Sequence, residues 1–337
     1  MSAMLSVRNL CVSFRTERGV VRAVDHVSFD VGDGEILGIV GESGSGKTVS
    51  LLSVIGLIID PNAIIEGSIV YKGRELIGLP QRELRHVRGN EIAMIFQDPM
   101  TALTPVYTIG WQIAEQVMTH NRMSKSAARQ RAVDLLAEVG FANPSAAVDR
   151  YPHELSGGMR QRAVIAMALS CNPSLLIADE PTTALDVTVQ AQILDLVQKL
   201  RRDHGSAVVL ITHDMGVVAE VADRVMVMYA GRVAEQGATR DLFKSPWHPY
   251  TWGLLDSIPP LEGARPRRLK SIGGNPPSLL ALPPGCAFAP RCRHSFHRCN
   301  ERPELTGADG HRAACFIPPA DREAARAGRI AAPAGAS

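Results

Sequence analysis

Short apolar runs alternate with segments of helical periodicity along most of this chain. The β-type runs cover residues 35–40, 92–96, 174–178, 207–212 and 224–229. Between two of them, residues 189–201 carry Ile193, Leu194, Val197 and Leu200 at the spacing of one helix face. Such alternation is typical of an α/β domain with a largely parallel sheet. We therefore predict an α/β fold over residues 4–238.

Three regions depart from this alternation. Residues 98–162 have a mostly helical pattern, with 127–139 rich in Ala, Leu, Glu and Arg, and predict a helical subdomain inserted in the α/β core. From residue 239 prolines recur and periodicity is lost, so 239–317 is predicted to be a C-terminal extension with little regular structure that needs an external staple. The Ala-, Pro- and Gly-rich stretch 318–337 is predicted to be disordered.

Composition narrows the class of protein. The 337 residues are 45% hydrophobic, and 36 basic residues balance 34 acidic ones to a net charge of +2. No nucleic-acid partner is expected, because such partners usually require a concentrated basic stripe. The longest apolar tract, around 49–59, is shorter than the ~20 residues that a membrane-spanning helix needs, and the N-terminus lacks the pattern of a secretory signal. These features predict a soluble, intracellular protein.

The strongest motif is a glycine-rich loop of the form GxxxxGK(S/T), which reads Gly41-Glu42-Ser43-Gly44-Ser45-Gly46-Lys47-Thr48. It follows an apolar run and precedes the helix-like stretch 49–57, as a phosphate-binding loop requires. Its glycines let backbone N–H groups turn toward phosphates, and the helix N-terminus adds partial positive charge. We expect Lys47 to reach the β- and γ-phosphates of ATP and Thr48 to hold Mg²⁺.

A pair of carboxylates closes a second apolar run. Asp179 and Glu180 follow the stretch 175–178, at the carboxyl end of a predicted parallel strand, where α/β sheets bind ligands. Such a pair alone is more often a solvated strand end, but the phosphate loop favours a functional role. We expect Asp179 to join the Mg²⁺ shell and Glu180 to act as general base toward the attacking water.

The stretch Leu155-Ser156-Gly157-Gly158-Met159-Arg160-Gln161-Arg162 resembles the signature motif of ABC ATPases, which ordinary phosphate-loop enzymes lack. Gln97, Ala184-Leu185-Asp186 and His213 match that family's Q-loop, D-loop and switch histidine in order. The resemblance implies an ABC-type nucleotide-binding domain of the P-loop NTPase class. It also implies that Gln97 senses the γ-phosphate and Mg²⁺ and that His213 contacts the γ-phosphate. Phe14 stands where the family stacks a ring on adenine, although a lone Phe fits core packing equally well.

The same resemblance implies a head-to-tail dimer. Each ATP would lie between the Lys47 loop of one subunit and Ser156, Gly157 and Gly158 of the other, whose N–H groups at a helix start would complete the γ-phosphate cradle. ATP would close the dimer and hydrolysis would let it open.

Other stretches resemble the oligopeptide/dipeptide importer ATPases within this family. They are residues 97–106, where Ala102 and Thr104 replace the usual Ser and Asn, and the segments 248–251 and 282–288. The resemblance spans residues 4–317. It implies a peripheral ATPase on the cytoplasmic face of the inner membrane that powers the import of di- or oligopeptides. The implied partners are two transmembrane permease subunits, a second and similar ATPase in a heterodimer rather than a homodimer, and indirectly an extracytoplasmic solute-binding protein.

Cysteines crowd the extension, at Cys286, Cys292, Cys299 and Cys315. In a reducing compartment such a group binds metal more readily than it forms disulfides. The resemblance implies a [4Fe–4S] cluster, because similarly placed cysteines hold one in related importer ATPases. A structural zinc site, with His294, His297 and His311 as substitute ligands, and four free thiols are the alternatives.

Other functions stay open at this level. Similar ATPases import other small solutes, such as nickel chelates. A non-transport ABC ATPase that acts on DNA or ribosomes is disfavoured, since the chain has one ATPase domain and only about a hundred residues without sustained heptads separate its phosphate loop from its signature motif. An iron–sulfur redox protein that uses ATP incidentally is disfavoured by the complete set of ATPase motifs.

Overall fold

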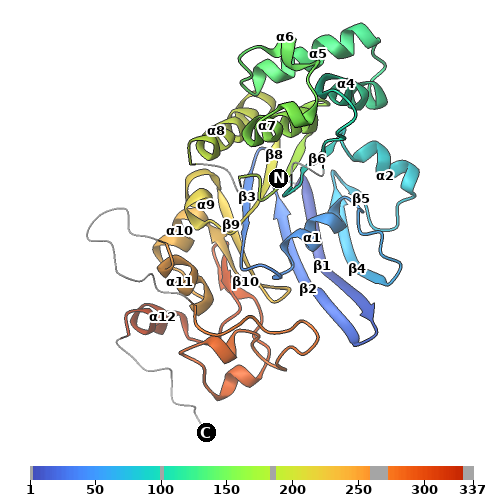
Figure 1. The fold of residues 1–337 in the computed structure, drawn as a ribbon. Coiled ribbons are helices and arrows are strands. Elements are labelled where there is room, and N and C mark those ends of the chain that lie inside the picture. Colours follow the sequence, from blue (N-terminus) through green and yellow to red (C-terminus); the bar gives the residue numbers. More distant parts are fainter. Residues whose placement is uncertain (1–2, 99–101, 183–186, 259–271, 329–337) are drawn as a thin grey trace. The chain divides into compact units, whose positions relative to one another are not determined.

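The computed structural model describes residues 3–98, 102–182, 187–258 and 272–328. The chain divides into two units, each discontinuous in sequence. One comprises Met1–Met4, Val31–Ile36 and Gly78–Ile211, and the other Leu5–Asp30, Leu37–Ile77 and Thr212–Ser337. The N-terminal strands and the C-terminal extension therefore belong to the same unit (Figure 1). These two units do not coincide with the predicted domains 4–238 and 239–317. That division of the chain therefore stays a prediction.

The unit that contains residues 78–211 has parallel strands and the helices that connect them. Its elements are α2 (Gln81–Val87), β6 (Ile92–Ile95), α4 (Ile109–His120), α5 (Lys125–Glu138), α6 (Pro144–Ala147), η1 (Pro152–Glu154), α7 (Gly157–Leu169), β7 (Leu175–Asp179), α8 (Val187–His204) and β8 (Ala207–Thr212). β7 pairs in parallel with β6 and with β8. Every residue of β7 and β8 is buried, as expected for strands covered on both faces.

Helices α4, α5, α6 and α7 pack against one another in this unit (Figure 1). Three of them begin at a capping hydroxyl: the side chains of Thr108, Ser124 and Ser156 accept hydrogen bonds from the backbone N–H groups of Trp111, Ala127 and Met159. Ala114 and Val117 of α4 and Ala128 of α5 lie in one buried cluster. The described part of residues 98–162 is mostly helical, and its status as an inserted subdomain stays a prediction.

The second unit contains both antiparallel and parallel pairing. Its elements are β1 (Leu5–Thr16), β2 (Gly19–Val31), β3 (Ile36–Val40), α1 (Lys47–Val54), β4 (Ala63–Tyr71), β5 (Arg74–Glu75), α9 (Met215–Val221), β9 (Arg224–Tyr229), β10 (Arg232–Ala238), α10 (Thr239–Lys244), α11 (Pro249–Asp256), η2 (Ala289–Arg291), η3 (His297–Asn300), β11 (Thr306–Ala308), β12 (His311–Ala313) and α12 (Pro319–Arg326). One antiparallel sheet has the strand order β2-β1-β4-β5. Elsewhere in the unit, β3 and β9 are parallel, and β9, β10, β12 and β11 follow one another antiparallel.

The prediction of a largely parallel sheet is therefore wrong for the N-terminal strands. In β1 the buried Leu5, Val7, Leu10 and Val12 are interspersed with exposed or half-buried residues. This alternation shows that only one face of β1 is buried, which is typical of antiparallel strands. Every residue of β3 is buried, which is typical of parallel strands. The fold is an α/β domain with mixed strand directions.

The C-terminal extension has more regular structure than its composition predicted. β12 pairs with β10, so that Glu235 lies opposite Ala313. Tyr250 of α11 and Phe288 lie in one buried cluster with Val40 and Tyr229. The extension thus buries its apolar residues against the strands of its own unit, and its fold is not held by a staple alone.

The tail from residue 318 was predicted to be disordered, and for residues 318–328 this is wrong. α12 starts at two prolines, which favour a helix start, and buries Arg322 and Ala325. The Arg322 guanidinium lies 4.6 Å from the Trp247 ring centre, and Ala325 packs with Trp252 and Ile317. Composition did not predict these contacts because Ala and Arg, and not large apolar residues, supply them. Residues 329–337 lie outside the described part of the chain.

Candidate functional site

The loop 41–48 connects the buried strand β3 to helix α1 and is tightly packed at two of its glycines. Gly41 has φ +153°, and a Cβ there would lie 2.2 Å from the Met228 carbonyl oxygen. A Cβ on Gly46, at φ +97°, would lie 2.4 Å from the Ala23 carbonyl oxygen. Only glycine fits at these two positions. These two glycines therefore set the path of the loop.

The Lys47 side chain forms hydrogen bonds to the backbone at the start of the same loop. Its side chain is 6% exposed, and Nζ donates hydrogen bonds to the carbonyl oxygens of Gly41 at 2.8 Å and Glu42 at 3.1 Å. The Ser45 hydroxyl is buried and has no hydrogen-bond partner within the described residues. Ser43, Gly44 and Thr48 are exposed. The loop thus presents one cation and several small polar groups, which is the chemistry that phosphate binding requires.

In the other unit, the carboxylates end β7. Asp179 is the last residue of the strand and is 3% exposed. Glu180 follows with φ +48°, in the left-handed region that non-glycine residues rarely adopt, and its N–H donates to the Ile211 carbonyl at 2.9 Å. Gln97 Nε2 donates to Glu180 Oε2 at 3.1 Å. Strained backbone of this kind gathers at functional sites. The structure therefore brings together Gln97 and Glu180, two residues 83 positions apart.

The signature motif forms the start of α7. Ser156 is its N-cap, with Oγ accepting from the Met159 N–H at 3.3 Å, and Gly157 and Gly158 form its first turn. A Cβ on Gly158 would lie 3.1 Å from the Val189 side chain, whereas one on Gly157 would meet nothing within 4 Å. Gly157 is exposed at this N-terminus. The helix end has the partial positive charge and N–H groups that favour an anion.

Sequence reasoning assigned no role to Gln161 within this motif. Its side chain is 2% exposed, and Nε2 donates to the Pro181 carbonyl oxygen at 2.8 Å. Pro181 directly follows Glu180. The signature helix and the carboxylate turn are therefore fixed to each other by a buried hydrogen bond. Its place inside the recognised motif was the available clue in the sequence.

Of the remaining residues predicted to contact the nucleotide, the structure describes His213 and Phe14. His213 is exposed between β8 and α9, next to Asp214, whose side chain caps α9. Phe14 is half-buried on β1 opposite Ala63. The D-loop residues 184–186 lie outside the described residues, as does part of the stretch 97–106.

The four cysteines of the extension line a single small cavity of about 20 Å³, together with Phe288, His294 and Phe316 among others. All four are half-buried. The Cys286 N–H donates to the Cys299 carbonyl at 2.9 Å, which joins the first and third cysteine segments. Burial raises the pKa of the Cys292 thiol to about 12 and that of Cys315 to about 11. Without a bound cation these thiols are therefore protonated at neutral pH.

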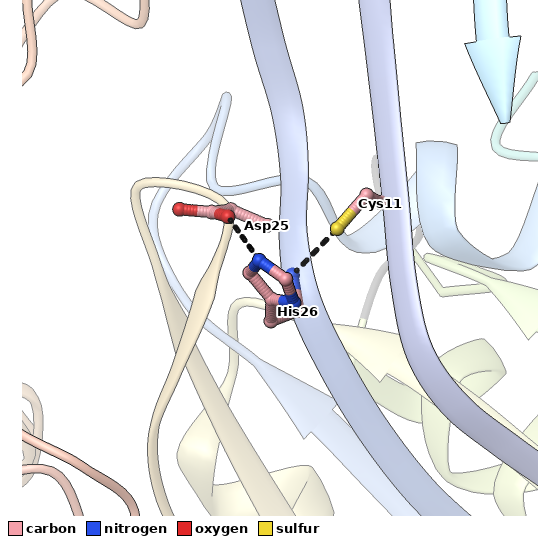
Figure 2. Close-up of side chains that lie close together, drawn as sticks. All are labelled: Cys11, Asp25 and His26. Carbon is pink, nitrogen blue, oxygen red and sulfur yellow. Dashed lines mark hydrogen bonds and ion pairs between the residues drawn. The ribbon is translucent and has the colours of Figure 1, made fainter. Parts of the chain in front are cut away.

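A second group of potential ligands, Cys11, Asp25 and His26, lies on β1 and β2 (Figure 2). The His26 N–H donates to Cys11 Sγ at 3.3 Å, and His26 Nε2 lies 3.7 Å from Asp25 Oδ1. Asp25 is buried, and its other oxygen lies 2.7 Å from Arg232 Nε and 3.6 Å from Arg302. Burial opposes ionisation of Asp25, yet these arginines hold its pKa below the usual value. The guanidinium groups of Arg232 and Arg302 already balance the charge of Asp25, which a metal ion would otherwise do. We therefore assign Cys11, Asp25 and His26 to a structural ion-pair network and not to a metal site.

Among the described residues, no helix combines the length and apolar character that crossing a membrane requires. The loop, the carboxylate turn and the signature helix define an ABC-type ATPase. Comparison with known sequences agrees. A family model described as ABC transporter matches residues 24–183, and one described as oligopeptide/dipeptide transporter, C-terminal region, matches residues 234–299.

Individual relatives cover nearly the whole chain. The dipeptide transport ATP-binding protein DppD of Bacillus subtilis is 51% identical over 322 residues, covering 94% of this chain and 95% of that protein. The oligopeptide transport ATP-binding protein OppD of Salmonella typhimurium is 50% identical over 318 residues, covering 94% of each. The chain belongs to this family of ABC transporter ATP-binding proteins.

A similar solved structure is that of an ATP-binding cassette in a dimeric, post-hydrolysis state bound to ADP and Pi. It is 29% identical with a TM-score of 0.64, and the match covers 70% of this chain and 99% of that one.

Proposed function

We propose that this chain binds ATP and Mg²⁺ on the loop 41–48 and hydrolyses the γ-phosphate bond with Glu180 as general base. Lys47 would contact the phosphates, Thr48 would hold Mg²⁺, and Asp179 would add a ligand to the ion. Such an ion would supply charge neutralisation at the phosphate oxygens. Water attacks the γ-phosphorus, its proton passes to the Glu180 carboxylate, and the bond to the leaving ADP oxygen breaks. The observation that carries this proposal is the hydrogen bond from Gln97 to Glu180 at a strained turn directly after Asp179.

The exposed N-terminus of α7 supports a site completed by a second ATPase subunit. Ser156, Gly157 and Gly158 stand where backbone N–H groups have no partner within the helix. We assign them to the γ-phosphate of an ATP held by the partner's phosphate loop, in a head-to-tail dimer. The dimeric state of the related cassette bound to ADP and Pi supports this arrangement. His213 and Phe14 are assigned to the γ-phosphate and to adenine. A similar but distinct companion ATPase is the proposed partner.

Peptide import is the proposed use of this ATPase. The relatives named above are dipeptide and oligopeptide transport proteins, and the extension matches the oligopeptide/dipeptide C-terminal region. The chain would then sit peripherally on the cytoplasmic face of the inner membrane and bind two permease subunits. A solute-binding protein outside the membrane would deliver the peptide.

Reconstitution tests this use. Vesicles that hold the two permeases, the companion ATPase and this chain, with the solute-binding protein present, should accumulate a labelled tripeptide only when ATP and Mg²⁺ are supplied. The matched control contains the Glu180→Gln chain, which should abolish accumulation. Accumulation of a nickel chelate in place of peptides, or ATP hydrolysis with no solute movement, would each contradict the proposal.

For the four cysteines we propose a [4Fe–4S] cluster that links the parts of the extension. The thiols surround one cavity, and four thiolates are the ligands that such a cluster takes. Among the described residues, only Cys11, Asp25 and His26 bring three potential ligand atoms within 4.8 Å of one another, so no three of the four thiols are that close. Four thiolates on one zinc, at about 2.3 Å each, would lie only about 3.8 Å apart. The thiols are therefore more widely spaced than a single zinc requires.

A buried cation next to the cavity also fits this group. Arg322 is 5% exposed, its Nε donates to the Ile317 carbonyl, and its Nη1 has no hydrogen-bond partner within the described residues. Arg322 interacts electrostatically with Cys315. Four thiolates around a cluster carry net negative charge, so this guanidinium would compensate it.

We predict that the chain, purified anaerobically, contains about four iron and four sulfide per chain and absorbs visible light as expected of a cubane cluster. Cys292→Ser should lose most of the iron and lower the melting temperature by several degrees, because losing a metal link raises the conformational entropy of the unfolded segment and removes the binding energy of the cluster. Cys171→Ser, which changes a half-buried cysteine of the other unit, is the control and should keep its iron. Stoichiometric zinc, or a colourless chain without metal, would contradict the cluster.

A further inference from the structure

The C-terminal extension contacts the phosphate loop itself. Arg291 of η2 and Glu42 of the loop form a two-pronged ion pair, with Nη1 2.6 Å from Oε2 and Nη2 2.9 Å from Oε1. Both residues belong to the same unit, although 249 positions separate them. The Arg291 side chain is only 4% exposed, and that of Glu42 is 29% exposed. Paired N–H···O bonds of this kind are directional and strong, and they fix the carboxylate in one place.

Other contacts hold the backbone of the same loop residue. The Glu42 N–H donates to the Tyr250 hydroxyl at 2.8 Å, and its carbonyl accepts from Lys47 Nζ at 3.1 Å. Tyr250 lies in α11 and is fully buried. Glu42 is therefore held through its side chain, its N–H and its carbonyl. Two of these three contacts come from the extension, and the third comes from the phosphate-binding lysine.

Arg291 is itself held rigidly. Its Nε donates to the Gly273 carbonyl at 2.9 Å, its Nη1 also contacts the Tyr229 hydroxyl, and its guanidinium lies 5.8 Å from the Tyr229 ring centre. In the chain Arg291 directly precedes Cys292. The extension thus offers a fixed cation to the loop.

Charge explains why the loop needs this cation. Glu42 lies between Gly41 and Ser43, inside a loop whose function is to attract phosphates. An unpaired carboxylate there would repel a triphosphate and weaken the field of Lys47. When Arg291 neutralises this carboxylate, the ion pair also connects the extension to the loop and holds the loop in place.

The structure assigns Arg291 and Tyr250 as positioning residues of the nucleotide site, acting through Glu42. This inference rests on the proposed binding of ATP by the loop 41–48. The extension is then part of the ATPase and not an appendage to it: the loop takes its phosphate-binding shape only while the segment around Cys292 is in place. Arg291 touches no phosphate in this role, so its removal should change ATP affinity more than the turnover number.

A double-mutant cycle in the full-length chain tests the inference. Kd for Mg·ATP would be measured by isothermal titration on wild type, R291A, E42Q and R291A/E42Q. R291A should weaken binding about tenfold, because the buried partner of a charge pair is lost and a carboxylate is left beside the phosphates. R291A/E42Q should recover to within about threefold of wild type, since the neutral amide no longer repels ATP. In steady-state assays R291A should raise KM for ATP by about the same factor as Kd and change kcat by less than about twofold.

The controls separate this role from a general effect on folding. Arg293→Ala removes an exposed arginine on the other side of Cys292 and should bind ATP as wild type does. If R291A proves too unstable to purify, R291K keeps the charge but loses the two-pronged geometry, and it should weaken binding about threefold. Wild-type affinity in R291A or R291K would overturn the inference, as would a double variant that binds as weakly as R291A. A wild-type chain that binds no ATP would instead refute the proposed function.

Discussion

Replacing Glu180 by Gln is expected to reduce the turnover number for ATP hydrolysis by about 10²–10⁴-fold, the range that a general base contributes. The amide has nearly the same shape and can still accept the hydrogen bond that Gln97 Nε2 donates at 3.1 Å. It cannot accept the proton of the attacking water. ATP binding should therefore persist within about threefold of wild type. Phosphate release under saturating ATP and Mg²⁺, alongside an equilibrium binding assay, measures both quantities.

The control for this variant is Glu115→Gln, which makes the same chemical change at an exposed residue of α4 in the same unit. It should hydrolyse ATP at the wild-type rate. Wild-type turnover in the Glu180 variant would exclude Glu180 as the base. Loss of binding together with turnover would show that Glu180 holds the nucleotide and does not activate water.

Lys47→Ala is expected to weaken ATP binding by about 10²-fold or more, since hydrogen bonds to charged groups contribute about 1.5–3 kcal/mol each and several are lost. The lysine is almost completely buried, and its Nζ now holds the carbonyls of Gly41 and Glu42. Its removal takes away the loop's cation and also leaves two carbonyl groups without their donor. Binding of ATP in magnesium buffer, followed by calorimetry, gives the size of the effect.

Lys72→Ala serves as the comparison, because it removes an exposed lysine from the same unit and should leave affinity unchanged. Thermal unfolding of both variants shows whether the native fold persists. A Lys47 variant that is folded and binds ATP as wild type does would contradict the role of the loop.

The parts of the site that the sequence predicted are those that depend on local geometry. Gly41 and Gly46 can be recognised because no side chain fits where the loop runs, and Lys47 because the motif fixes its distance from them. Asp179 and Glu180 could be placed at a strand end because a fully apolar run precedes them. Each inference used contacts within a few residues, and spacing along the chain was enough.

Contacts between distant segments could not be predicted in this way. Nothing in the sequence around Arg291 indicates that its partner is Glu42, and nothing in β1 shows that its neighbour is the antiparallel β4. The tail was misjudged for a related reason: Arg322 reads as a solvated residue, yet its guanidinium lies against Trp247. Long polar side chains bury their stems and stack on rings only where the tertiary fold offers a surface.

The central claim is that ATP is held by the loop 41–48 of one ATPase subunit and the Ser156–Gly158 segment of another. The most direct measurement is the molar mass and bound nucleotide of the Glu180→Gln chain by size-exclusion chromatography with light scattering, alone and with its companion ATPase. The account predicts that Mg·ATP converts the subunits to dimers that retain ATP, and that Ser156→Arg, which blocks the helix N-terminus, prevents this. Subunits that remain monomeric and carry no nucleotide at saturating Mg·ATP would contradict it.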